Sequence, residues 1–376
     1  MDVPKNAATE RRDYRIFAFS REELALDWRS FYRGLVEVFA DSRPPSISRD
    51  SALARVTRAV QPQLDEVEAR IARQAAAFDP AIEGYVTYAI GSRGKRLRPL
   101  MALLSGGASG GITSGHIDLA VIVELIHIAT LVHDDIMDEA ERRRAQPTVN
   151  ARWGNSLSVL LGDCLFAQAL NLSTNFDNAE ISRVIARAAR EVCSGEIIQT
   201  QRRFDLHLAI ADYLKIVEMK TGSLFAAAAE LGAVLNSADR ETTTALKNFG
   251  SKIGAAYQIY DDCLDIAGNE SEIGKTLGTD LRKGKMTLPI LMLLQSAPPE
   301  ERERYCELIL NDKAGAIAKL LKNDAPNGAL RAALDAGDDS VREAQTELHA
   351  LPPNPFTDAL FQVGDALREM LDQIRA

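Results

Sequence analysis

Residues 131–148 read LVHDDIMDEAERRRAQPT, and this stretch determines which fold the rest of the chain can adopt. The apolar run before the acids, Val121 to Val132, has the length of a core helix rather than that of a strand. Asp134 and Asp138 are four residues apart, so on a helix they lie one turn apart on one face, with Asp135 beside them. We therefore expect a buried helix that carries three carboxylates at its C-terminal end.

Such a cluster is electrostatically unfavourable by itself. Carboxylates repel one another, and the negative end of the helix dipole adds to the repulsion. All-oxygen ligands select hard cations, and Mg²⁺ commonly takes one or two carboxylates together with substrate phosphates. A solvated acidic helix end would also explain a single cluster, so the choice depends on the rest of the chain.

A second copy of the pattern ends another predicted helix. Residues 260–265 read YDDCLD, where Asp261 and Asp265 repeat the four-residue spacing and Asp262 lies between them. The helical run that leads to these acids starts near Thr242. Both clusters have the same spacing and follow an apolar helical run, so they predict one site in which the two acid clusters bind several metal ions between them. The charge of these ions would be neutralised by a diphosphate.

Three basic segments accompany the acids. Residues 91–99 read GSRGKRLRP, where Lys95 and Arg98 can point in the same direction near a helix start, although a solvated basic turn is the alternative. Residues 142–144 are all arginine, and residues 273–285 read IGKTLGTDLRKGK. The last segment is not a P-loop, because its order differs and it follows a helix. We predict a metal-bound diphosphate on the acids and a second, metal-free diphosphate on the bases.

Composition narrows the class of protein. The chain has 376 residues with 46% hydrophobic content, enough for one large domain or two small ones. Its formal net charge of -9 disfavours nucleic-acid binding, and its four cysteines lack the paired spacing of a zinc site. No run of about eighteen uncharged apolar residues and no apolar signal segment is found. We expect a cytoplasmic protein without a membrane span.

Helical patterns dominate from Ser51 onward, and sustained period-two alternation is scarce, so the predicted fold class is all-α. From Ser51 onward, predicted helices include residues 51–77, 155–172, 181–202, 209–220, 222–235, 242–267 and 289–295. Past Pro298 the segments are shorter and more charged, and we predict that they lie at the periphery. Residues 1–60 form a predicted N-terminal extension with an amphipathic helix at Glu22 to Phe39.

Seven motifs, in their order along the chain, resemble those of the trans-isoprenyl diphosphate synthases, the polyprenyl synthetase family. They are GKRLRP at 94–99, ELIH at 124–127, DDIMD with the following arginines, GEIIQ at 195–199, Lys220-Thr221, YQIYDDCLD at 257–265 and the loop at 274–285. The resemblance covers roughly Leu64 to the C-terminus. It implies a catalytic domain at residues 61–376, an isoprenoid synthase helical bundle around a deep cavity, and a homodimer.

The resemblance also implies a role for each motif residue. Three Mg²⁺ per active site would bind the allylic diphosphate through Asp134, Asp138 and Asp261, with Asp135, Asp262 and Asp265 ligating or orienting the ligands. The same diphosphate would contact Arg143, Lys220, Lys275 and Lys285. Isopentenyl diphosphate would contact Lys95, Arg98, His127 and Arg144. Lys220, Thr221 and Gln258 would lie near the reacting atoms. Ala145 stands where the family often has glycine, which removes no ligand.

The implied reaction is the head-to-tail condensation of isopentenyl diphosphate with an allylic diphosphate, which lengthens a trans-polyprenyl chain. Metal ions and basic side chains stabilise the leaving diphosphate in a water-excluded site. The isopentenyl double bond attacks the allylic cation, and the departing diphosphate can take the proton. No side-chain base is required, so we predict a structural role for His133.

Product length is predicted from the residues below the first acid cluster. In the family, bulky residues four and five positions before the first aspartate close the cavity, whereas here these are Thr130 and Ala129. The cavity should extend toward Ile126 and Val123, deeper on the same helix. Products of C20 or longer are therefore favoured.

Three alternatives remain open. The strongest is a prenyltransferase of the same fold that uses a different acceptor. A class I terpene cyclase shares the first acid motif, but its second metal site contains Asn, Ser and Glu. A non-catalytic subunit of a heteromeric synthase typically loses acids that this chain keeps.

Overall fold

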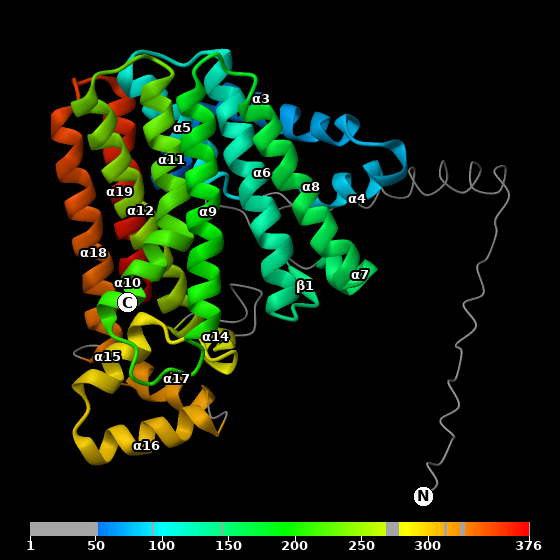
Figure 1. Ribbon diagram of the computed structural model, residues 1–376. Coiled ribbons are helices and arrows are strands. Elements are labelled where there is room, and N and C mark those ends of the chain that lie inside the picture. Colours follow the sequence, from blue (N-terminus) through cyan, green and yellow to red (C-terminus); the bar gives the residue numbers. More distant parts are fainter. Residues whose placement is uncertain are drawn as a thin grey trace, which may run out of the picture. The chain divides into compact units, whose positions relative to one another are not determined.

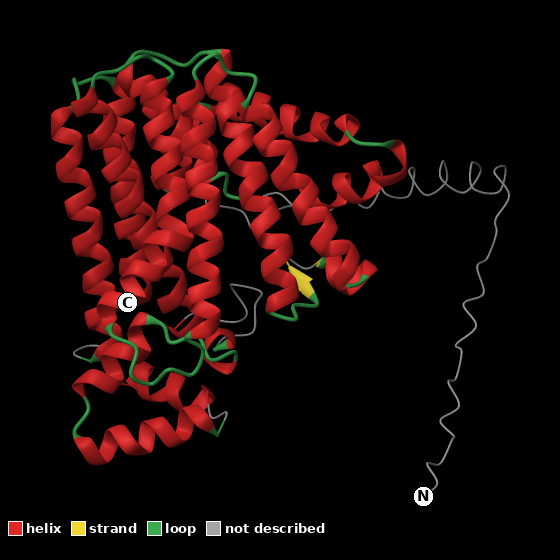
Figure 2. Cartoon of the chain, in the orientation of Figure 1, coloured by secondary structure: helices red, strands yellow, loops and turns green. Residues whose placement is uncertain are grey.

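The computed structural model describes residues 52–91, 94–143, 146–267, 278–311, 314–323 and 328–375. These residues are almost entirely helical, as Figure 2 shows, and the predicted all-α class is confirmed. Within them, the strands β1 (Arg142–Arg143) and β2 (Gln146–Pro147) form a short antiparallel pair. The predicted helix at 22–39 lies outside the described residues.

The helices of the first half are α2 (Ala52–Arg58), α3 (Gln61–Arg73), the 3-10 turn η1 (Gln74–Ala77), α4 (Pro80–Ile90), α5 (Leu97–Ser109), α6 (Ser114–Met137), α7 (Val149–Trp153), α8 (Asn155–Ser173) and α9 (Ala179–Gln201). Those of the second half are α10 (Ile210–Val217), the π-helical turn η2 (Glu218–Gly222), α11 (Ser223–Val234), α12 (Arg240–Ala267), α14 (Thr279–Arg282), α15 (Leu288–Ser296), α16 (Pro299–Leu310), α17 (Ala314–Asn323), α18 (Ala329–Glu347), the 3-10 turn η3 (Leu348–Ala350) and α19 (Pro355–Arg375).

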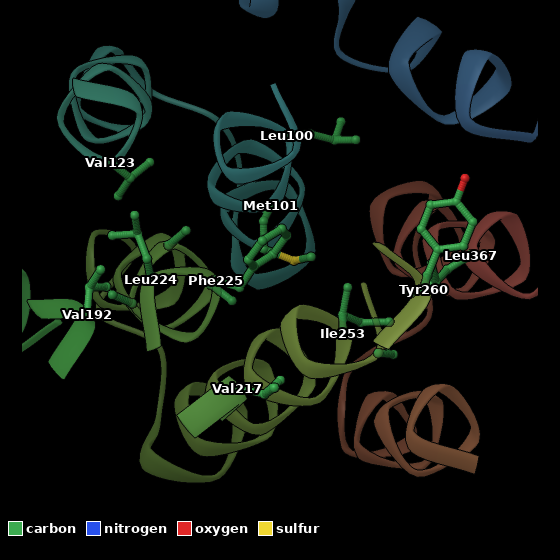
Figure 3. Close-up of a cluster of buried hydrophobic side chains, with 14 of the residues drawn as sticks. Leu100, Met101, Val123, Val192, Val217, Leu224, Phe225, Ile253, Tyr260 and Leu367 are labelled. Carbon is green, nitrogen blue, oxygen red and sulfur yellow. The ribbon is translucent and has the colours of Figure 1, made fainter. Parts of the chain in front are cut away.

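The centre of the bundle consists of α5, α6, α11 and α12, which pack side by side (Figure 1). The sequence of α11 is rich in alanine and glycine, and this lets its neighbours approach closely. At Gly232, an added Cβ would lie 2.8 Å from the carbonyl oxygen of Ala102 in α5. Figure 3 shows Met101 beside Phe225, and Val123 facing Leu224, within the core that these helices share.

The prediction of one helix over residues 51–77 is wrong in one respect. The chain turns at residues 59–60, so that α2 and α3 are separate helices. Pro62 lies in the first turn of α3, where proline is favoured because no intrahelical donor is lost. Val56 and Val60 are fully buried and α2 packs against α19, so residues 52–60 belong to the helical bundle.

The prediction that the chain past Pro298 is peripheral is wrong for its last two long helices. Leu334 and Val341 of α18 are buried against α12, and Leu360 and Leu367 of α19 are buried beside α5. Most of their charged residues lie on the opposite faces, and the buried Asp338 is paired with Arg342 and Arg368, so a high charge content did not indicate exposure. By contrast, α16 and α17 lie at one end of the bundle (Figure 1).

Two described helices, α6 and α8, are long and apolar enough to cross a membrane by length and composition alone. The most apolar window of α6 is 67% buried inside the bundle, and that of α8 is 33% buried. A buried core helix passes the same test, and α6 is such a helix. These two helices are therefore weak evidence for a membrane span.

His116 joins three helices near the start of α6, where its side chain is fully buried. Its Nδ1 accepts a hydrogen bond from the backbone N–H of Thr113 at 3.0 Å, so the neutral ring carries its proton on Nε2. Nε2 donates to the carbonyl oxygen of Gly232 in α11 at 3.0 Å. Gly106 of α5 faces the ring, and a side chain there would clash with it.

We expect this histidine to make the fold sensitive to acid. Burial lowers the pKa of His116 below its ordinary value of 6.5. As the pH falls, the unfolded chain therefore binds a proton at this histidine before the folded chain does. The free energy of unfolding is highest above pH 6.5, and it decreases as the pH falls from 6.5 to the lower pKa of the folded state. Denaturant unfolding at about pH 8 and about pH 5.5 should show a smaller pH dependence for His116→Gln than for wild type. Equal dependences would contradict this role.

Candidate active site

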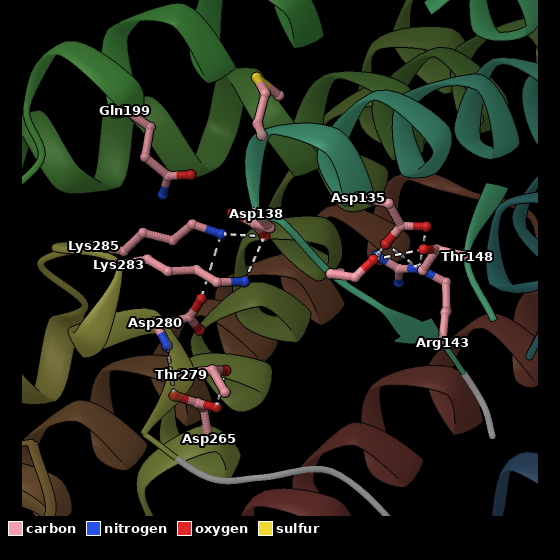
Figure 4. Close-up of polar contacts among 12 residues, drawn as sticks. Asp135, Asp138, Arg143, Thr148, Gln199, Asp265, Thr279, Asp280, Lys283 and Lys285 are labelled. Carbon is pink, nitrogen blue, oxygen red and sulfur yellow. Dashed lines mark hydrogen bonds and ion pairs between the residues drawn. The ribbon is translucent and has the colours of Figure 1, made fainter. Parts of the chain in front are cut away.

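The first acid cluster lies at the C-terminal end of α6, which is capped by Asp138. Asp135 is buried and accepts two hydrogen bonds from Arg143 on β1, with Nη2–Oδ1 at 2.8 Å and Nε–Oδ1 at 3.0 Å (Figure 4). Asp134 lies within electrostatic reach of Lys220 and Glu196 instead. Burial raises the pKa of Asp134 to about 6, although the Lys220 charge opposes the shift. A cation at this carboxylate would favour its charged form.

Three cations from two loops surround Asp138. Lys285 Nζ is 2.9 Å and Lys283 Nζ is 3.6 Å from Oδ2 (Figure 4). An Arg203 nitrogen is 3.6 Å from Oδ1. Burial alone would raise the pKa of Asp138, but the charges of Lys285 and Lys283 lower it. Among the described residues, no donor makes a hydrogen bond to the buried Oδ1. This oxygen can therefore accept a further cationic ligand.

Lys285 also connects the two acid motifs. Its Nζ is 3.4 Å from Asp280 Oδ1 in α14, and the backbone N–H of Asp280 donates to Asp265 Oδ2 at 3.2 Å. Thr279 Oγ1 donates to the other oxygen of Asp265 at 3.0 Å. The two motifs, far apart in sequence, thus flank one Lys285–Asp280 ion pair (Figure 4).

Asp262 is the buried end of a hydrogen-bonded chain. Thr221 Oγ1 donates to Gln258 Oε1 at 2.7 Å, and Gln258 Nε2 donates to Asp262 Oδ1 at 2.8 Å. The hydroxyl of Tyr213 in α10 donates to Asp262 Oδ2 at 2.6 Å. Burial, with the charges of Asp280 and Asp261, raises the pKa of Asp262 to about 8. Both of its oxygens are engaged, so Asp262 orients Gln258 and Thr221.

Lys220 lies in the π-helical turn η2, a local geometry that is frequent at functional sites. Its Nζ donates to Gln199 Oε1 at 3.0 Å and forms an ion pair with Glu196, both on α9. The close approach of α9 depends on Gly195, where an added Cβ would lie 2.8 Å from the backbone nitrogen of Lys220. The GEIIQ motif therefore supplies the partners that hold this lysine.

Two of the cations predicted for isopentenyl diphosphate lie over aromatic rings. Lys95 Nζ is 5.7 Å from the ring centre of Tyr257 and 6.0 Å from that of Tyr260. The Arg98 guanidinium lies 4.7 Å from the ring centre of Phe225. Burial lowers the pKa of Arg98, and within the described residues its buried Nε has no hydrogen-bond partner. The two cations share one aromatic wall, which α11 and α12 provide.

His127 faces a different cavity. We call this the α4–α6 cavity; it is lined by Tyr88, Arg96, Glu124, His127, Ile128, Asp135, Arg143 and neighbouring residues. Lys95 lines a second cavity together with Tyr257, Phe225 and residues of α19. The structure therefore places His127 and Lys95 on two different cavities, and Arg98 lines neither of them. Arg144 and Lys275 lie outside the described residues.

The chain-length residues are all on α6. Ala129, Ile126 and Val123 are fully buried, and the hydroxyl of Thr130 donates to the carbonyl oxygen of His127 at 2.7 Å. Neither of the two cavities above is lined by these four residues. His133 packs over Gly162 of α8, and its Nε2 lies 3.1 Å from the carbonyl oxygen of Val159, a helix–helix contact.

Among the described residues, no three acidic, histidine or cysteine side chains form a ready-made metal cage. Asp134, Asp138 and Asp261 lie at the ends of two helices, and basic side chains separate the two groups. Carboxylates arranged in this way suit ions that also bind ligand phosphates. The sequence reasoning assigned no role to Asp280, Arg203 or Tyr213. Arg203 and Tyr213 contact the acid motifs from distant parts of the chain, and Asp280 was part of a loop whose predicted role rested on its basic residues, so the motif spacing gave no indication of these three.

An all-α bundle with two acid-bearing helix ends and interleaved lysines defines a class of enzymes that bind diphosphates. Comparison identifies the family. The model of the polyprenyl synthetase family matches residues 79–323, well over half of the chain. The chain belongs to the polyprenyl synthetase family.

Individual relatives agree. The octaprenyl diphosphate synthase of Escherichia coli K12 is 31% identical over 274 residues, which cover 73% of this chain and 85% of that protein. The nonaprenyl diphosphate synthase of Mycobacterium tuberculosis is 34% identical, over 84% of this chain and 94% of that protein. A crystal structure of a polyprenyl synthase from Caulobacter crescentus, complexed with calcium and isoprenyl diphosphate, is similar with a TM-score of 0.78 and 34% identity. That match covers 87% of this chain and 99% of the other.

Proposed function

We propose that this chain condenses isopentenyl diphosphate with an allylic diphosphate, head to tail, to make trans-polyprenyl diphosphates of C20 or longer. It is a trans-prenyltransferase of the polyprenyl diphosphate synthase class. One observation supports this proposal most strongly. Two acid motifs from different helices flank the Lys285–Asp280 pair, with Lys220 beside the first motif.

The donor set fits a hard divalent cation. Asp134 is a half-buried carboxylate whose pKa is raised by desolvation, and Asp138 has a buried oxygen without a hydrogen-bond donor among the described residues. We assign Asp134, Asp138 and Asp261 as ligands of Mg²⁺, three ions per site, with Asp135, Asp262 and Asp265 orienting the others. When bound, Mg²⁺ would supply Lewis-acid stabilisation of the departing diphosphate.

The basic side chains would divide between the two substrates. Arg143, Lys220 and Lys285 would bind the allylic diphosphate and stabilise the negative charge that grows on it as the C–O bond breaks. Lys95, Arg98 and His127 would bind isopentenyl diphosphate. In the described structure Lys95 and His127 line different cavities.

Thr221 and Gln258 would act near the reacting carbons. The hydroxyl proton of Thr221 is committed to Gln258, which is held in turn by Asp262. The lone pairs of the Thr221 oxygen are left for the developing allylic cation, which they would stabilise. No residue of the chain is required as the base, because the released diphosphate would take the proton.

The decisive assay combines purified protein, Mg²⁺, labelled isopentenyl diphosphate and allylic starters of C5, C10, C15 and C20, with product length read by chromatography. We expect elongation to C20 or beyond with at least one starter. Cleavage of the starter without elongation would favour a different acceptor or a cyclase. No reaction with any starter would contradict the proposal.

We expect Ala129→Phe to shorten the main product. Ala129 is fully buried on α6, five residues before Asp134, so a ring there would block a chain that grows past this level. Overpacking should cost about 1–3 kcal/mol of stability, which product analysis at a low temperature tolerates. Ile128→Phe, on the wall of the α4–α6 cavity, is the control and should leave the product unchanged. If both variants gave the same distribution of product lengths, the bottom of the chain-binding cavity would not lie at Ala129.

We also propose a homodimer that buries the outer face of α8. Val159 is 43% and Leu160 65% exposed, which is unusual for neighbouring apolar residues of one helix. Burial of this face in a dimer also accounts for the apolar character of α8 without a membrane span, consistent with a cytoplasmic enzyme. Light scattering should give twice the chain mass of 41.1 kDa for wild type and a monomer for Leu160→Glu. A monomeric wild type would contradict this.

A further inference from the structure

Arg96 lies between the two residues predicted to bind isopentenyl diphosphate, Lys95 and Arg98, yet its own side chain is only 8% exposed. Its guanidinium joins two helices. Nη1 donates to Glu124 Oε1 of α6 at 2.6 Å, and Nη2 and Nε donate to the two oxygens of Glu68 of α3. Burial opposes the charge, but the hydrogen bond to Glu68 and the charge of Glu124 raise the pKa of Arg96 above its ordinary value.

The backbone of Arg96 is as constrained as its side chain. It has φ 49° and ψ 38°, the left-handed region that a non-glycine residue rarely adopts, and it is the residue from which α5 begins. The surrounding structure must hold such a conformation in place. The ion pairs with Glu68 and Glu124 are the contacts that hold this residue.

This conformation sends neighbouring side chains to different cavities. Lys95 lines the cavity beside α19 and lies over Tyr257, whereas Arg96 lines the α4–α6 cavity. Arg98, one residue into α5, lies over Phe225 on the same aromatic wall as Lys95. If Arg96 lost its ion pairs with Glu68 and Glu124, the backbone would lose the left-handed turn that directs Lys95 and Arg98 to one side.

We propose that Arg96 is a positioning residue for isopentenyl diphosphate: clamped by Glu68 and Glu124, it fixes the left-handed turn that aims Lys95 and Arg98 at one ligand. Arg96 itself does not touch substrate. Its planar guanidinium reaches two carboxylates at once, which a lysine cannot reproduce. The inference rests on the proposed function, because that function makes Lys95 and Arg98 diphosphate ligands.

The test measures the two substrates separately. In Arg96→Gln, the KM for isopentenyl diphosphate should rise about ten- to a hundredfold, because small displacements of positioning groups have effects of this size. The KM for the allylic starter should stay within about twofold. Arg96→Lys should fall between this variant and wild type. Calorimetric titration with isopentenyl diphosphate alone should show the same order of affinities.

Three further variants separate positioning from folding. Arg70 of α3 also bridges to α6, through Asp118, and pairs with Glu66 of its own helix, but it does not flank the ligand residues. Arg70→Gln should therefore alter the thermal midpoint without changing either KM. Arg96→Gln alone leaves the charge of Glu124 buried and unpaired. The double variant Arg96→Gln with Glu124→Gln removes that charge, and it should still raise the KM for isopentenyl diphosphate and not the KM for the allylic starter. Arg96→Gly accommodates the backbone but removes the clamp, and it should show the rise as well.

The outcomes separate a failure of the proposed function from a failure of the positioning role of Arg96. If wild type fails to elongate any starter, the proposed function fails. If wild type elongates normally, an equal rise of both KM values in Arg96→Gln, or a normal isopentenyl diphosphate KM in Arg96→Gly, overturns the positioning role alone.

Discussion

Asp134→Asn should lower kcat by about a thousandfold or more while the protein remains folded. Asparagine has the same shape, but it is a neutral ligand that cannot hold divalent cations against a diphosphate. Loss of electrostatic stabilisation at a single oxyanion-type group costs about 10²–10³ in kcat, and a lost metal ion should cost at least as much. Steady-state elongation at saturating Mg²⁺ measures the loss.

Stability should move in the opposite direction. Burial raises the pKa of Asp134 to about 6 from 3.8, so the fold disfavours the charged carboxylate at neutral pH. Replacing that charge with an amide should leave the thermal midpoint of the metal-free protein unchanged or higher, as is common when a functional group is removed from a strained site. Asp339→Asn, at an exposed position on α18, is the control and should change neither activity nor midpoint. Near-normal turnover in Asp134→Asn would refute the metal assignment.

The sequence predicted what depends on local periodicity. Spacing alone placed Asp134 and Asp138 at one helix end, and the structure has α6 ending between Met137 and Asp138. It also predicted the boundaries of α8, α9 and α12 to within a few residues. These features follow from the 3.6-residue repeat and from local apolar content, which a single chain displays.

Other features depend on partners that periodicity does not reveal. The turn η2 at Lys220 is π-helical, and the predicted break between two helices near Lys220 is a continuous helical path instead. This turn packs closely against Gly195 of α9, and its Lys220 pairs with Glu196 of the same helix. The peripheral position predicted for α18 and α19 was wrong because overall charge was counted without its distribution around each helix. The left-handed turn at Arg96 depends on two carboxylates from other helices.

Asp135 and Asp138 illustrate the same limit within the site. The motif resemblance already separated them, with Asp138 as a direct ligand of Mg²⁺ and Asp135 as a residue that ligates or orients, but it did not give their partners. In the structure Asp135 is held by Arg143, whereas Asp138 faces Lys285, Lys283 and Arg203. The two residues are three positions apart and lie on roughly the same side of α6, so their different roles come from different tertiary partners, which the spacing does not reveal.

Lys285→Met should cause the second large loss of activity, about 10²–10³ in kcat, and it should also destabilise the fold. Lys285 is the cation between Asp138 and Asp280, with 10% of its side chain exposed. Burial would lower the pKa of Lys285, but the charges of Asp280 and Asp138 raise it, so the lysine stays charged at neutral pH. Removal leaves two partly buried carboxylates without their shared partner, which costs several kcal/mol.

Lys283→Met provides a matched comparison, because this second lysine also reaches Asp138. Its Nζ is 3.6 Å from the carboxylate rather than 2.9 Å, and its side chain is 31% exposed. A longer ion pair whose lysine is partly exposed is worth about 0–1 kcal/mol, so the loss in kcat should stay below about tenfold. Urea unfolding of both variants separates lost stability from lost catalysis. If the two variants lose equal activity at equal stability, total positive charge near Asp138 matters and the bridging position of Lys285 does not.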